Sequence, residues 1–274
     1  MRYALIVVLV LLLVPPTLAQ APRQALADSP SPERSPPATS LARTPEKKSP
    51  RSTGALQGTV RWNSAEVPQP TPMPAATALV GCGDLRALQD VSVSDQGGGI
   101  DNVILALVDV PAEAAPPPAP ERLVLDNIDC RFSPHVAVLT AGSLLEMRNS
   151  DPILHLVHLY GPREANIAFP FKGMKVSRTI ETAGVTIVKC DVHPWMQAFI
   201  RVDDHPFHAV TDRSGSFRIM DVPAGAHMLE AWHETLGTRQ RTVRIVDGET
   251  TTITLDFPRR RRAAPHLDDR EAQE

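Results

Sequence analysis

The sequence has few cysteines and little net charge. Only three of its 274 residues are cysteine, and the formal net charge at pH 7 is -3. A nearly neutral chain carries no electrostatic signal for nucleic acid or for an acidic membrane surface, so neither is expected as a partner. The four arginines at 259–262 are a local exception, and we expect 258–274 to be a disordered, solvated charged tail.

Long apolar runs and catalytic motifs are also missing. After residue 14 no apolar run approaches the roughly 20 residues of a transmembrane helix, so no transmembrane span is expected in the mature chain. The sequence has no phosphate-binding loop, no carboxylate pair at a meaningful spacing and no nucleophile beside a base; the glycines at 97–99 are an isolated turn. We therefore expect a protein that is not an enzyme.

The N-terminal residues are expected to lie outside any folded domain. A positive start, an apolar run over 4–14 and small residues over 17–21 are typical of a secretory signal peptide, predicted at 1–21. Repeated Ser-Pro pairs then indicate a disordered Pro/Ser-rich linker over 22–54. The mature protein is expected to be periplasmic or secreted.

The rest of the chain consists of short β-type runs separated by turn residues. In the first part they fall at 56–62, 102–108, 122–125, 135–139, 144–147, 153–160, 176–180, 185–189 and 197–202. Strands at this spacing predict an all-β fold with a β-sandwich over 55–203. Later runs, separated by hairpin turns that contain glycine, predict a small C-terminal β-sandwich domain over 204–257.

Several metal-binding side chains are grouped near residue 190. Cys190, His193 and Met196 follow one another at three-residue intervals, and His155 lies upstream in an apolar run. Two imidazoles, a thiolate and a weak axial thioether are the ligands of a type 1 (blue) copper centre. If 185–189 is a strand, Cys190 ends it and Met196 opens the returning strand. The pattern therefore predicts one copper ion.

The odd number of cysteines matters in an exported chain. At most two of the three can pair within the chain in an oxidising compartment. A disulfide between Cys82 and Cys130 leaves Cys190 free, and a bound metal would keep the Cys190 thiol ionised. Parity does not fix the connectivity, so a structure in which Cys190 pairs and another cysteine stays buried remains the alternative.

The residues around this group resemble the cupredoxin family. Cys-x-x-His-Pro-aromatic-Met at 190–196 is similar to the short ligand loop of one cupredoxin subtype, the amicyanin type. His-Leu-Val-His at 155–158 resembles that family's His-Asn-Val-His segment, with Leu156 in place of the Asn. The resemblance covers mainly 135–203 and implies a cupredoxin-like Greek-key β-sandwich. Its implied copper ligands are His155, Cys190, His193 and Met196.

The same resemblance assigns roles to the neighbouring residues. It implies that His193 lies near the surface as the electron port, with Pro194 and Trp195 in an apolar collar that docks a redox partner. His158 follows His155 by three residues, which puts the two on opposite faces of a strand. We therefore expect His158 either to support the ligands indirectly or to have a purely structural role. Asp151, before Pro152, is expected to belong to a turn.

Residues 204–257 resemble the carboxypeptidase-regulatory, transthyretin-like β-domains. The matching motifs are Thr-Asp-x-x-Gly-x-Phe at 211–217 and Val-Pro-x-Gly at 222–225. Domains of that family are usually non-catalytic and assist folding or binding.

The favoured function is an exported type 1 copper protein that carries single electrons to and from an unidentified redox partner. One alternative is a non-redox protein that stores or delivers copper, or in which the metal only stabilises the sandwich. Another is a zinc site formed by His155, His158, Cys190 and His193, because zinc prefers Cys and His in a tetrahedral arrangement.

Overall fold

The computed structural model describes residues 52–64, 69, 71–72, 82, 87–88, 91–111, 115 and 119–257. Every regular element in these residues is a β-strand, so the predicted all-β fold is confirmed. The predicted signal peptide 1–21, nearly all of the linker 22–54 and the tail 258–274 lie outside the described residues. Within that described part, no helix is long and apolar enough to cross a membrane.

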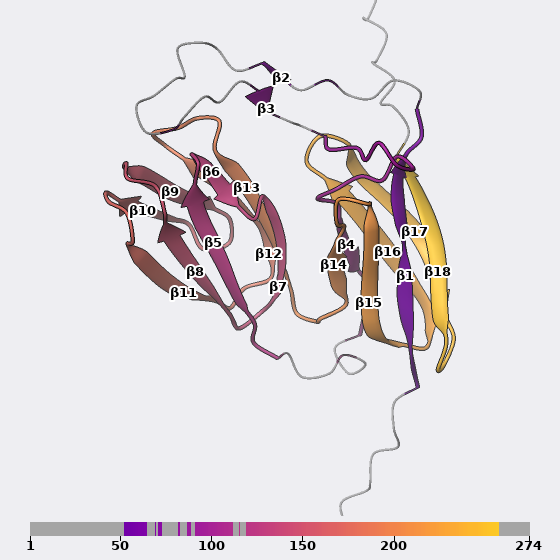
Figure 1. Cartoon of the computed structure of the whole chain (residues 1–274). Helices are drawn as coiled ribbons and strands as arrows, with labels where there is room; N and C mark the ends of the chain where they lie inside the picture. Colours follow the sequence, from indigo (N-terminus) through magenta and orange to yellow (C-terminus); the bar gives the residue numbers. More distant parts are fainter. Residues whose placement is uncertain are drawn as a thin grey trace, which may run out of the picture. The chain divides into compact units, whose positions relative to one another are not determined.

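The strands between residues 122 and 203 form two sheets that share one core (Figure 1). One sheet has the order β10-β9-β12-β13-β7 and the other has the order β11-β8-β5-β6. The strands are β5 (Arg122–Ile128), β6 (Arg131–Ser133), β7 (Val136–Thr140), β8 (Ser143–Asn149), β9 (His155–Tyr160), β10 (Ala165–Phe169), β11 (Lys175–Ile180), β12 (Gly184–Cys190) and β13 (Gln197–Asp203). We call this part the inner sandwich.

Two-residue alternation decides which side chains face the core of the inner sandwich. In β9, Val157 and Leu159 are buried and pack with Leu145 and Met147 of the opposite sheet. Burying each such side chain stabilises the fold by about 1.5–3 kcal/mol. Because side chains two residues apart share a face, His155 points into the same core as Val157. The strand pattern thus places an imidazole inside the protein.

A second pair of sheets is formed by strands that come before and after the inner sandwich in the sequence. One sheet has the order β14-β4-β16-β17, the other β15-β1-β18, and the short strands β2 and β3 pair separately. The strands are β1 (Thr53–Trp62), β2 (Thr71–Pro72), β3 (Ala87–Leu88), β4 (Ile104–Leu107), β14 (His208–Val210), β15 (Ser216–Pro223), β16 (Gly225–His233), β17 (Gly237–Ile245) and β18 (Thr250–Phe257). The two larger sheets share an apolar core and form the outer sandwich.

This strand pairing divides the chain differently from the expected domains 55–203 and 204–257. β1 lies between β15 and β18, while β4 lies between β14 and β16, so both belong to the outer sandwich. The inner sandwich is therefore an insertion between β4 and β14. The reason is that hydrophobic periodicity identifies a strand but not its partner. Here Leu56 and Val60 of β1 pack with Phe217 and Ile219 of β15.

Candidate metal centre

Three strand ends bring the predicted ligands together. His155 is the first residue of β9, Cys190 is the last residue of β12, and Met196 directly precedes β13. β9 and β12 are antiparallel neighbours with Cys190 opposite Val157, so the start of one strand lies beside the end of the other. His193 lies on the loop between Cys190 and Met196. The ends of neighbouring interior strands thus bring together His155 and Cys190, which are 35 positions apart in sequence.

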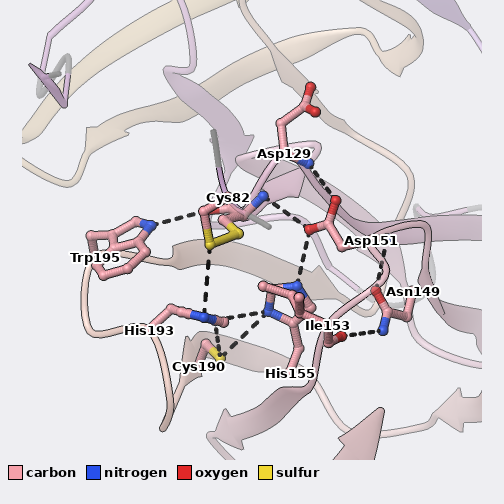
Figure 2. Close-up of a disulfide and its surroundings, with 10 residues drawn as sticks. Cys82, Asp129, Asn149, Asp151, Ile153, His155, Cys190, His193 and Trp195 are labelled. Carbon is pink, nitrogen blue, oxygen red and sulfur yellow. Dashed lines mark hydrogen bonds and ion pairs between the residues drawn. A yellow bond between two sulfur atoms is a disulfide. The ribbon is translucent and has the colours of Figure 1, made fainter. Parts of the chain in front are cut away.

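The imidazoles and the thiol point at one another (Figure 2). The Nδ1 atoms of His155 and His193 are 3.0 Å apart, and the Cys190 Sγ lies 3.8 Å from the first and 3.6 Å from the second. All three side chains are at most 2% exposed. Cys190 is free of any disulfide.

The size of this triangle fits a metal ion. A triangle with edges of 3.0, 3.6 and 3.8 Å has a circumradius of about 2.0 Å, so one point lies that far from all three donor atoms. Metal–nitrogen and metal–sulfur bonds in proteins measure about 2.0–2.3 Å. The donor set of two imidazoles and one thiolate is also the equatorial set that suits copper in both oxidation states. The residues present therefore fit the ion that the sequence implies.

Burial lowers the pKa of both histidines below the ordinary value. For His155 desolvation dominates over the opposing effect of Asp151, and for His193 desolvation is reinforced by the neighbouring His155. A lowered pKa favours the neutral imidazole, which is the form that binds a metal. The site is therefore pre-disposed toward its ligand form at neutral pH.

Asp151 orients His155. Its Oδ2 accepts a hydrogen bond from Nε2–H of His155 at 3.0 Å, which leaves the Nδ1 lone pair facing Cys190 and His193. The same carboxylate accepts the backbone N–H groups of Asp129 and Cys130 at 2.8 and 2.9 Å. This network fixes both the tautomer and the ring plane of His155.

Asn149 in turn holds the segment that carries Asp151. Its Oδ1 accepts the Asp151 N–H at 3.0 Å, and its Nδ2 donates to the carbonyls of Ile153 and Phe169. Asn149 is 1% exposed, and Figure 2 shows it beside Asp151 and Ile153. The turn before β9 is therefore tied to its surroundings on several sides.

A disulfide covers the other histidine. Cys82 and Cys130 are bonded to each other, and the Sγ of Cys82 lies 3.9 Å from Nε2 of His193. The indole N–H of Trp195 donates to the carbonyl of Cys130 at 3.1 Å. His193 is consequently only 2% exposed, so the expectation of a surface imidazole is wrong. The imidazole is buried because Cys82, 111 residues away in sequence, lies against the ring.

Met196 is buried beside the triangle. It is 1% exposed and belongs to the same core cluster as Cys190. Its N–H donates to the carbonyl of His193 at 2.9 Å, and its own carbonyl accepts the N–H of Cys190 at 3.3 Å. These two bonds close the loop 190–196 into a tight turn, with the side chain of Met196 in the buried core.

The remaining predicted residues lie around this cluster. His158 faces away from it and contacts Asp191 at 3.2 Å and Glu164 at 3.1 Å, so the four-ligand zinc set that includes His158 is not assembled. Pro194 is exposed and Trp195 is half-buried. Leu156 joins the segments that carry His155 and Cys190 through its carbonyl, which accepts the N–H of Asp191 at 3.2 Å.

Sequence reasoning missed two parts of the site. Asp151 was expected only in a turn, although its position four residues before His155 was a usable signal. The contact between Cys82 and His193 had no sequence signal, because the two residues are 111 positions apart in sequence.

A two-sheet β-sandwich with a buried His-Cys-His cluster at one end defines a candidate metal-binding β-protein. No family model matches the sequence, and no curated protein matches it. The solved structures that align with the chain include cupredoxins, all at low TM-scores.

Three of these alignments show how partial the likeness is. A Cu-containing nitrite reductase from Thermus scotoductus SA-01 aligns with a TM-score of 0.29 and 24% identity over 35% of this chain and 25% of that chain. A Cu(I) form of a mutant amicyanin aligns with a TM-score of 0.27 and 20% identity over 30% of this chain and 82% of that chain. A purple cupredoxin from Nitrosopumilus maritimus aligns with a TM-score of 0.27 and 18% identity over 30% of this chain and 99% of that chain. These scores are too low to support an inference about this chain.

Proposed function

We propose that the protein is an exported type 1 copper protein that carries single electrons. One copper ion would be held by Nδ1 of His155, Nδ1 of His193 and Sγ of Cys190, with the thioether of Met196 as a weak fourth ligand. The observation that carries the proposal is the triangle of donor atoms, whose common point lies about 2.0 Å from each. The mixed nitrogen and sulfur set favours copper over harder cations.

The surrounding residues would keep the donors in place during electron transfer. Copper supplies a one-electron couple between Cu(I) and Cu(II). Asp151 holds His155 by a hydrogen bond, and the pairing of β12 with β9 and β13 holds Cys190 at a strand end. Donors that are fixed before the charge changes need little rearrangement afterwards. Such a site suits electron transfer without substrate chemistry, so we propose no enzymatic activity.

A second function is favoured by the burial of His193. If this imidazole is covered by the Cys82–Cys130 disulfide, the shortest route from the ligands to a partner protein is blocked. The protein would then hold or deliver copper without exchanging electrons quickly. Both functions use the same ligands and differ in the rate of electron exchange.

Copper reconstitution of the purified exported form tests these functions. An electron carrier should show an intense visible thiolate-to-copper band that reductant bleaches and oxidant restores, with rapid exchange to small redox mediators. A band that is present but exchanges electrons slowly would favour the copper-holding function. A colourless protein that binds zinc in preference to copper would reject both. Cys190→Ser should abolish the band.

A further inference from the structure

A cavity opens in the inner sandwich at the end opposite the ligand cluster. It is bordered by the end of β9 and the start of β12, whereas His155 starts β9 and Cys190 ends β12. Its volume is about 360 Å³, within the range of small-molecule sites. Its lining includes the buried Leu145, Leu159 and Ile200 and the exposed Arg163, Arg178 and Glu181.

Arg178 occupies an inward-facing position of β11. β11 lies beside β8 (Figure 1), and Arg178 is directly opposite Leu145 of β8 in this antiparallel pair. Opposite residues share a face of the sheet. Val176 and Ile180, its neighbours on this face, pack against the apolar core. The alternation of core-facing and solvent-facing residues along β11 predicts an apolar residue at position 178. An arginine here brings a guanidinium to the border of an apolar cavity.

The charge of Arg178 is not matched within the described part of the protein. On the rim, Arg163 and Glu181 form an ion pair at 3.8 Å, which engages the carboxylate that lines the cavity. Across residues 119–257, Arg178 forms no ion pair. Since arginine forms strong bidentate bonds with carboxylates, an anionic group from outside the chain suits this position.

We propose that this cavity binds a linear anionic amphiphile, specifically a free medium-chain fatty carboxylate. Its carboxylate would pair with Arg178, and its alkyl chain would lie against Leu145, Leu159 and Ile200 between the sheets. The apolar floor and the single unmatched cation together select an occupant that is apolar along its length and negative at one end. The site shares no residue with the metal cluster and does not depend on copper.

Calorimetric titration of the purified protein with dodecanoate, kept below its micelle concentration, tests the proposal. We expect one saturable site that Arg178→Gln weakens about tenfold or more, since a hydrogen bond to a charged group accounts for at least one decade of affinity. Arg244→Gln, at an exposed arginine of β17, is the matched control and should leave binding unchanged. Ile200→Phe, which fills the cavity from its floor, should also abolish binding.

Several outcomes would overturn the proposal. Equal binding of dodecan-1-ol would show that the anionic group is irrelevant, and unchanged affinity in Arg178→Gln would remove the role of the guanidinium. No saturable binding of dodecanoate would reject the site. Binding through Arg178 only to anionic vesicles would assign it to a membrane surface instead. Because Arg178 is exposed, its variant tests the proposal even if Ile200→Phe fails to fold.

Discussion

The inner and outer sandwiches both bury histidines, but they surround them differently. In the outer sandwich two buried histidines have separate backbone partners: His227 donates to the carbonyl of Pro223 at 2.8 Å, and His233 accepts the N–H of Thr235 at 3.1 Å. In the inner sandwich His155 and His193 instead turn their Nδ1 atoms toward each other and toward Cys190. Convergence of donor atoms, rather than burial of histidine, distinguishes the proposed metal site.

The first prediction removes one donor from each sandwich. His155→Gln should abolish the visible copper band and saturable copper binding, because two donors no longer close the triangle. His227→Gln should leave both unchanged, because the ring of His227 contacts the carbonyl of Pro223 and the carboxylate of Asp109 and, among the described residues, no other metal-binding imidazole or thiol. Copper titration followed by absorption compares the variants. Equal copper binding by both would show that the inner cluster is not the site.

The second prediction concerns the stability that the outer sandwich gains from its apolar core. Leu229 is fully buried there, and Leu229→Ala should lower the free energy of unfolding by about 2–5 kcal/mol through lost burial and a cavity. Val246→Ala, at an exposed position of the same sandwich, should change it by about 0.5 kcal/mol or less. Denaturant unfolding measures both, and the copper band should stay unchanged in each.

The third prediction compares two Asp–His pairs of equal length. Asp151 bonds His155 and Asp203 bonds His208, both at 3.0 Å. Asp151→Asn should lower copper affinity about 10–100-fold, because the partner of a metal-binding imidazole orients the ring and raises its basicity. Asp203→Asn should leave the affinity as it is. A loss of copper affinity in Asp203→Asn but not in Asp151→Asn would contradict the role given to Asp151.

The smallest expected effect on affinity follows from replacing the buried thioether. Met196→Leu should change copper affinity by less than about tenfold, while shifting the reduction potential, because an axial ligand tunes potential more than binding. Met228→Leu in the outer sandwich should shift neither. Protein-film voltammetry measures the potentials. An unchanged potential in Met196→Leu would remove the thioether from the ligand set.

The local structure of the site could be predicted from the sequence. The expected strand 185–189 corresponds to β12, with Cys190 at its end, and the expected strand 197–202 corresponds to β13, directly after Met196. Alternation in β9 also places His155 on the core face. These features depend on residues close in sequence, and a period of two is enough to set them.

The long-range features could not be predicted. β1 pairs with β15 and β18 across more than 150 residues, and its apolar pattern would suit either sandwich equally well. The contact between Cys82 and His193 joins residues 111 positions apart in sequence. Strand pairing and chain path are set by tertiary packing, which local patterns do not encode.

X-ray absorption spectroscopy at the copper edge tests the central claim most directly. In the copper-loaded protein we expect two nitrogen scatterers and one sulfur scatterer close to the metal, with nitrogen at about 2.0 Å as the donor triangle requires. In Cys190→Ser the short sulfur contribution should vanish. A copper environment of nitrogen and oxygen alone in the unaltered protein would contradict the assignment of His155, Cys190 and His193 as the ligands.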